Sequence, residues 1–139
     1  MSITRLIEYQ EASEEIKLVY DDIMATRGTN WVNNFWKVLA TQPVLLKRTW
    51  EGVKSVMADG ALDSLTKEMI YIAVSITNNC NYCIHSHTYS ARKLGMTDDQ
   101  YKELLSVILM ANKTNALATA LGTKVDEVFD VSVEGEIKK

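Results

Sequence analysis

Two cysteines and a histidine lie close together in the sequence, at a spacing that suits thiol chemistry. Cys80 and Cys83 are three residues apart, and His87 follows four residues after Cys83. On a helix, separations of three and four residues place side chains on one face. A thiolate is the reactive form of cysteine, and a neighbouring imidazole can accept the thiol proton. The spacing therefore predicts a redox-active cysteine pair with His87 as its base.

A carboxylate further back in the chain can support this histidine. Glu68 lies twelve residues before Cys80, on the border of the apolar stripe of a helix expected over residues 63–77. A buried carboxylate without a partner is costly, so we expect Glu68 to hydrogen-bond a histidine or water. Held beside His87, it would orient the ring and stabilise the imidazolium, and the two would relay a proton to the thiol.

The cysteine pair predicts a two-step redox cycle. A helix is expected to begin near Cys80, and its positive end would favour thiolate over thiol. One thiolate would attack a peroxide O–O bond and become a sulfenic acid, which the other cysteine would convert to a disulfide. An external dithiol would then reduce that disulfide by exchange. We assign Cys83 as the attacking sulfur because it lies one turn from His87, and Cys80 as the resolving sulfur.

Other interpretations of the same residues stay open. Cys80 and Cys83 could be buried cysteines that pack as small hydrophobes. Together with His85 and His87 they could form a zinc site, although His85 would point about 140° from Cys80 on a helical wheel and zinc sites usually draw ligands from two segments. A metal-binding module and a non-catalytic helical assembly protein are the rival classes. We favour the redox pair and expect no bound metal or organic cofactor.

Helical periodicity runs through almost the whole chain, and no segment shows the alternation of a strand. The fold class expected is therefore all-α, in a single domain over residues 1–139 with its motif region at 30–122. The tail at 131–139 is polar, and we expect it to be poorly ordered. The helices are expected at residues 8–25, 31–40, 43–60, 63–77, 80–95 and 97–109, with a last short helix at 115–121.

The helix expected over residues 63–77 is apolar on nearly every side. Ile70 and Val74 lie opposite the main stripe that carries Met69 and Ile72. A helix of this kind is usually buried in a core or in an oligomer interface. We therefore expect the protein to form a homo-oligomer.

Composition excludes several broad classes of protein. The chain has 139 residues, 47% of them hydrophobic and 24% charged, with a net charge of −3, which is typical of a soluble globular domain. Neither nucleic acid nor a membrane is expected as a partner. The first ten residues do not resemble a signal peptide, so we expect a cytoplasmic protein. Structural disulfides are rare in that compartment, which favours a catalytic or metal-binding role for a close cysteine pair.

Two runs of the sequence resemble the alkylhydroperoxidase D-like and carboxymuconolactone decarboxylase-like family. They are Leu65-Thr-Lys-Glu-Met-Ile-Tyr-Ile-Ala-Val and Asn79-Cys-Asn-Tyr-Cys-Ile-His-Ser-His-Thr. The redox branch of that family has the pattern E-x11-C-x2-C-x3-H, which is filled here by Glu68, Cys80, Cys83 and His87. The resemblance covers about residues 30–121.

The resemblance implies a fold, an activity and partners. It implies a helical bundle with thiol-dependent peroxidase activity of an antioxidant kind, and an obligate oligomer, commonly a hexamer built as a trimer of dimers. It also implies a lipoyl-bearing or thioredoxin-type reductant. Tyr82 is a departure, because the best-known peroxidase of the family has a histidine there, and we give Tyr82 a supporting role. The decarboxylase branch lacks the cysteine pair, which argues against lactone decarboxylation.

Overall fold

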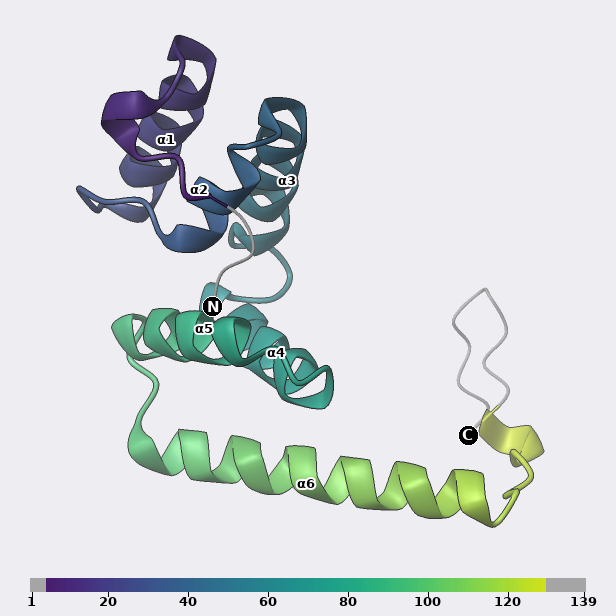
Figure 1. The fold of residues 1–139 in the computed structure, drawn as a ribbon. Coiled ribbons are helices and arrows are strands. Elements are labelled where there is room, and N and C mark those ends of the chain that lie inside the picture. Colours follow the sequence, from purple (N-terminus) through teal and green to yellow (C-terminus); the bar gives the residue numbers. More distant parts are fainter. Residues whose placement is uncertain (1–4, 130–139) are drawn as a thin grey trace. The chain divides into compact units, whose positions relative to one another are not determined.

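The computed structural model describes residues 5–129, and within that range it contains helices and no strand, so the predicted all-α class is confirmed. Figure 1 shows the helices in chain order. They are η1 (Tyr9–Glu11), α1 (Glu14–Arg27), α2 (Asn34–Leu39), α3 (Pro43–Met57), α4 (Ser64–Thr77), α5 (Asn81–Lys93), α6 (Asp98–Ala120) and η2 (Glu127–Phe129), where η denotes a 3₁₀ helix. The predicted tail at 131–139 lies outside the described residues.

The first helix begins later than the periodicity predicted. Ser13 accepts a hydrogen bond from the backbone N–H of Ile16, which fixes the start of α1 at Glu14. The residues before it form the separate turn η1, so the boundary expected at residue 8 was wrong. The helix ends at Arg27, two residues after the predicted end, and Gly28 just past it adopts a left-handed conformation with φ of 61°.

The last helix is longer than predicted. A capping box of Thr97 and Gln100 starts α6 at Asp98, next to the predicted start at residue 97, but the helix then runs without a break to Ala120. The separate helix predicted at 115–121 was therefore wrong. Neither glycine nor proline lies between residues 109 and 115, and the Thr114 hydroxyl bonds the carbonyl of Met110 within the helix.

Contacts divide the chain into two compact units that meet between Ser64 and Leu65, and each is described by itself. In the first unit, α1 and α2 both pack on α3. Its core contains Trp36 and Trp50, whose rings meet edge to face at 5.4 Å between centroids. The single domain expected from the sequence stays a prediction.

An ion pair supports the packing of α1 on α3 in the first unit. The indole N–H of Trp50 donates to Asp22 over 2.6 Å, and the ammonium of Lys54 donates to both oxygens of the same carboxylate. The hydrogen bonds from Lys54 and Trp50 hold the pKa of the Asp22 carboxyl below its ordinary value.

The second unit contains α4, α5 and α6, and its core lies between them. The buried side chains of this cluster are Ile72 of α4, Ala91 of α5 and Met96 of the loop before α6. Partly buried neighbours are Leu65, Met69, Ile76, Tyr101 and Leu104. This packing brings the middle of α4 against α5, which are the two helices that carry the predicted site.

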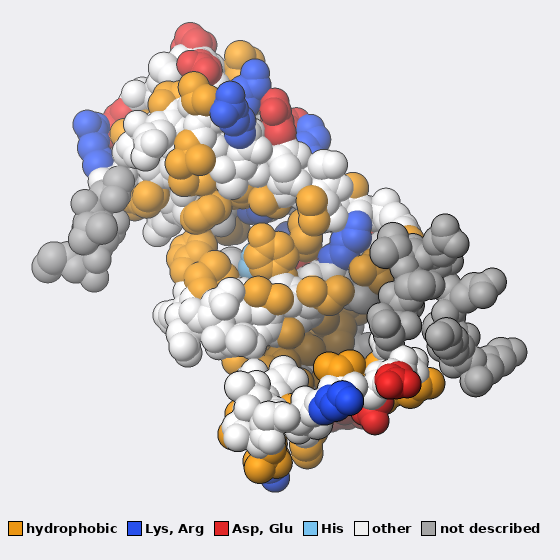
Figure 2. All heavy atoms as spheres, turned by 90° about the vertical axis from the view of Figure 1, so that its right-hand side faces the viewer, with side chains coloured by type: hydrophobic (Ala, Val, Ile, Leu, Met, Phe, Trp, Pro, Cys, Tyr) orange, Lys and Arg blue, Asp and Glu red, His pale blue; other side chains and the backbone are white. Residues whose placement is uncertain are grey.

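Large apolar side chains remain at the surface of the second unit. Ile70 and Val74 of α4, which lie opposite its main apolar stripe, are about half exposed, at 49% and 52%. Further exposed apolar residues lie on α6, namely Val107, Leu109, Met110 and Leu117. Figure 2 shows hydrophobic side chains, in orange, gathered at the surface of one face. Across residues 5–129, no helix combines the length and apolarity that a membrane crossing requires.

A tight turn joins α4 to α5. Asn79 has a left-handed conformation with φ of 56°, the only positive φ at a non-glycine position within residues 5–129. Its N–H donates to the carbonyl of Ile76, and the N–H of Cys80 donates to the carbonyl of Ser75. These two bonds form a Schellman motif, which closes α4 and places Cys80 directly before α5.

The left-handed conformation of Asn79 predicts that substitution of Asn79 and of its neighbour Asn78 will affect stability differently. Asn79→Ala should lower the free energy of unfolding by about 1 kcal/mol, because the short polar side chain of asparagine can hydrogen-bond locally and so tolerates the left-handed conformation, which the methyl group of alanine cannot do. Asn79→Gly should retain stability, since glycine adopts positive φ freely. Asn78→Ala is the matched control, and its effect should be smaller. Denaturant unfolding of the disulfide-bonded protein measures all three, and equal losses for the two alanine variants would contradict this account of the turn.

Candidate active site

The packing of α4 against α5 joins Glu68 to His87. Oε2 of Glu68 lies 2.6 Å from Nδ1 of His87, so the hydrogen bond expected between them is present. Both side chains are largely buried, with exposed fractions of 13% and 19%. An ionised carboxylate can only accept, so Nδ1 carries the proton and donates it. The lone pair of the neutral ring therefore lies on Nε2, which can accept a proton.

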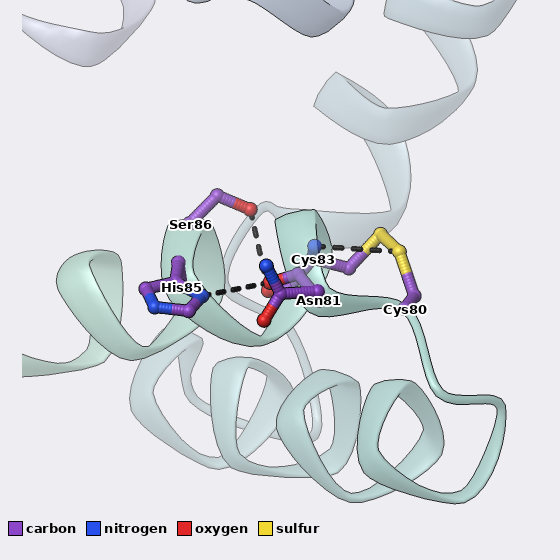
Figure 3. Close-up of a disulfide and its surroundings, with 5 residues drawn as sticks. All are labelled: Cys80, Asn81, Cys83, His85 and Ser86. Carbon is purple, nitrogen blue, oxygen red and sulfur yellow. Dashed lines mark hydrogen bonds between the residues drawn. A yellow bond between two sulfur atoms is a disulfide. The ribbon is translucent and has the colours of Figure 1, made fainter. Parts of the chain in front are cut away.

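Cys80 and Cys83 are joined by a disulfide at the start of α5. Cys80 is the N-cap residue, and its Sγ accepts a hydrogen bond from the N–H of Cys83 over 3.3 Å (Figure 3). Backbone N–H groups and the positive end of the helix both stabilise negative charge at this position. The predicted placement of the sulfurs near a helix start is thus confirmed.

The prediction that Cys80, Cys83 and His87 share one face of a helix needs a correction. Cys80 lies outside the first helical residue, Asn81, with φ of −85° and ψ of 88°, so helical spacing does not set its direction. Only Cys83 and His87 are related by a full helical turn within α5. The Schellman turn, rather than the helix, therefore positions the sulfur of Cys80.

Tyr71 belongs to the site, although the sequence analysis did not single it out. Its ring stacks on the imidazole of His87, with 3.8 Å between centroids and 18° between planes. Tyr71 follows Glu68 by three residues in α4, so both side chains lie on the same face of that helix. This spacing was the available signal in the sequence.

The other two candidate residues, His85 and Tyr82, are at the surface. His85 is exposed, and its Nδ1 lies 2.8 Å from the carbonyl oxygen of Asn81, away from the sulfurs (Figure 3). Tyr82 is 41% exposed, and its supporting role stays a prediction. Within residues 5–129, no three or more histidine, cysteine, aspartate or glutamate side chains are grouped so that they could hold a metal ion.

These side chains provide the components of thiol redox chemistry. Two sulfurs can interconvert between dithiol and disulfide at the start of a helix that stabilises a thiolate. An imidazole held by a carboxylate lies on the same helix and can accept and return a proton.

A solved structure resembles this chain over nearly its whole length. The crystal structure of the alkylhydroperoxidase AhpD core from Rhodospirillum rubrum is similar with a TM-score of 0.92 and 55% sequence identity. The match covers 95% of this chain and 99% of that one.

Curated relatives match over shorter stretches. The uncharacterized protein 4 in the cox locus of Paracoccus denitrificans is 44% identical over 39% of this chain and 49% of its own length. Alkyl hydroperoxide reductase AhpD of Maricaulis maris is 31% identical over 63% of this chain and 46% of its own length. The chain thus spans about half the length of these relatives.

The family assignment rests on the region that contains the site. The sequence model of the carboxymuconolactone decarboxylase family matches residues 43–123, which is more than half of the chain and includes α3 through α6. The chain therefore belongs to the carboxymuconolactone decarboxylase family.

Proposed function

We propose that the protein is a thiol-dependent peroxidase that reduces hydroperoxides through Cys80 and Cys83. The observation that carries this proposal is the hydrogen bond by which Glu68 of α4 holds His87 on α5, the helix whose start bears the two sulfurs. The similarity to proteins named alkyl hydroperoxide reductase AhpD, in Maricaulis maris and Mycobacteroides abscessus, supports the same activity.

The oxidative half of the cycle begins with the dithiol. Nε2 of His87 accepts the thiol proton of Cys83, and the thiolate attacks one peroxide oxygen. The O–O bond breaks, the departing alkoxide takes the proton back from His87 as an alcohol, and Cys83 becomes a sulfenic acid. The sulfur of Cys80 then attacks Cys83, and water leaves as the disulfide forms. One hydroperoxide and two thiols thus give one alcohol, one water and one disulfide.

The reductive half of the cycle needs two electrons from outside the chain. An external dithiol, of a lipoyl or thioredoxin type, attacks the Cys80–Cys83 disulfide and forms a mixed disulfide. Its second thiol then displaces the protein sulfur, which restores the dithiol. The N–H of Cys83 and the start of α5 stabilise the thiolate released at Cys80, which makes that sulfur a good leaving group.

Glu68 supports the proton transfers without touching the sulfurs in this proposal. Its carboxylate fixes the tautomer that leaves Nε2 free, and its charge stabilises the imidazolium formed when Cys83 loses its proton. The low exposure of both side chains strengthens this interaction, because little water competes for either group.

A thiol–disulfide oxidoreductase without peroxidase activity is the second candidate. The hydrogen bond from the N–H of Cys83 to Sγ of Cys80 favours it, because a stabilised thiolate is what exchange with another disulfide requires. Reduction of a small-molecule disulfide, in the absence of peroxide, distinguishes this activity from the first.

We also infer that the protein assembles with copies of itself, as a hexamer built from dimers. The half-exposed Ile70 and Val74 support this inference, since contiguous apolar surface on a soluble protein usually marks an interface. Light scattering should give a mass several times that of the chain, and the double variant Ile70→Asp, Val74→Asp should reduce it. A monomeric wild-type protein would refute the inference.

Consumption of an organic hydroperoxide with a small dithiol as reductant tests the proposed activity. Wild type should turn over. Cys83→Ser should abolish turnover because it lacks the attacking sulfur, and Cys80→Ser should turn over more slowly, since the external dithiol must then reduce the sulfenic acid on Cys83 directly. His87→Ala should reduce the rate by about 100-fold or more, the usual contribution of a general base. His85→Ala is the matched control and should retain the rate. The proposal fails if fully reduced wild type is inert, or if Cys83→Ser turns over normally.

A further inference from the structure

We propose that Tyr71 is a positioning residue, which holds the imidazole of His87 in the orientation that proton transfer to and from Cys83 requires. This inference rests on the proposed function, because it assigns a role in the same reaction. It starts from the stacked rings of Tyr71 and His87, which lie 3.8 Å apart and 18° from parallel.

The hydrogen bond to Glu68 alone leaves the imidazole one degree of freedom. The hydrogen bond at Nδ1 fixes one edge of the ring, but a hydrogen bond tolerates a range of angles, so the plane of the ring can still tilt by rotation about the Cβ–Cγ bond. Tyr71 lies flat against a face of the ring and blocks this rotation. Edge and face contacts together determine the direction of Nε2, the atom that must meet the thiol proton.

Both contacts come from one turn of α4. Glu68 and Tyr71 are three residues apart, so their side chains project from the same side of the helix and reach the same ring on α5. Because α4 is packed in the core through Ile72, the neighbour of Tyr71, the two contacts move together as one rigid support.

The stack also gains strength during the reaction. When His87 accepts a proton, its ring becomes a cation that lies over the electron-rich face of Tyr71, and the attraction between the rings increases. An interaction that is stronger after proton transfer lowers the barrier to that transfer. The phenol oxygen takes no part in either effect, so phenylalanine should replace tyrosine here without loss.

A proton NMR spectrum tests the stack without any assay of turnover. The chain has two histidines, and only His87 is stacked on a tyrosine. The ring current of Tyr71 should shift the carbon-bound protons of His87 upfield relative to those of the exposed His85. Tyr71→Phe should retain this shift, and Tyr71→Leu should remove it while the signals of His85 stay in place.

Kinetics test the consequence of the stack. Tyr71→Leu should lower kcat by about two- to tenfold, the range that the strength of an aromatic pair allows, with KM little changed. Tyr71→Phe should remain within about twofold of wild type. Tyr89→Leu, which removes an exposed tyrosine from α5, is the matched control and should retain full activity.

Alkylation of the reduced protein by iodoacetamide separates this inference from the proposed function. In the Cys80→Ser background, where Cys83 is the remaining cysteine, the reaction reports thiolate formation at Cys83 without peroxide. Tyr71→Leu should slow it, whereas Tyr71→Phe and Tyr89→Leu should not. If wild type consumes no peroxide, the proposed function fails, and the alkylation rates still decide the role of Tyr71. The role is refuted if Tyr71→Leu loses the upfield shift but keeps wild-type alkylation and turnover, or if Tyr71→Phe is as slow as Tyr71→Leu.

Discussion

The hydrogen bond between Glu68 and His87 constrains how α4 and α5 pack in the second unit of the protein. It joins side chains of two different helices over 2.6 Å, in a place where both are largely withdrawn from water. An unpaired carboxylate there would cost several kcal/mol, so α4 and α5 must keep one register. The packing of Ile72 and Ala91 maintains that register. This contact holds one edge of the imidazole, and the stacked ring of Tyr71 holds its face, so both depend on that register.

The turn between the two helices serves structure and chemistry at once. The backbone of Cys80 closes the Schellman motif of α4, and its sulfur caps α5. A thiolate accepts a hydrogen bond more strongly than a disulfide sulfur does, so reduction should strengthen the cap. The redox state of the cysteines is thereby linked to the start of the helix that carries His87. In this account, Asn79 matters because its conformation directs the chain into that cap.

Local rules predicted much of this fold from the sequence. The glycine that ends α1 and the capping box that begins α6 depend on a few adjacent residues, and the helix ends expected there lie within two residues of those observed. The break predicted near residue 110 was wrong because a polar stretch without glycine or proline can continue a helix. The position of Cys80 outside the helix depends on the turn before it, which helical spacing does not describe.

The candidate site was predictable only in part. Spacing within the chain led to Glu68, the cysteines and His87, and the bond between Glu68 and His87 is present. Tyr71 was missed because its significance depends on a ring from another helix, and its spacing of three residues from Glu68 shows only that the two side chains share a face of α4. The roles of Cys83 as attacking sulfur, of Cys80 as resolving sulfur and of Tyr82 as support stay predictions.

The proposal that Cys83 is the sulfur that attacks peroxide can be tested by locating the sulfenic acid that forms. The reduced single-cysteine variants Cys80→Ser and Cys83→Ser can each be exposed to one equivalent of hydroperoxide with dimedone, which traps sulfenic acid, and the product can be located by mass spectrometry. The account predicts an adduct on Cys83 in the first variant and little on Cys80 in the second, because only Cys83 lies one helical turn from His87. An adduct that forms on Cys80 alone would contradict it.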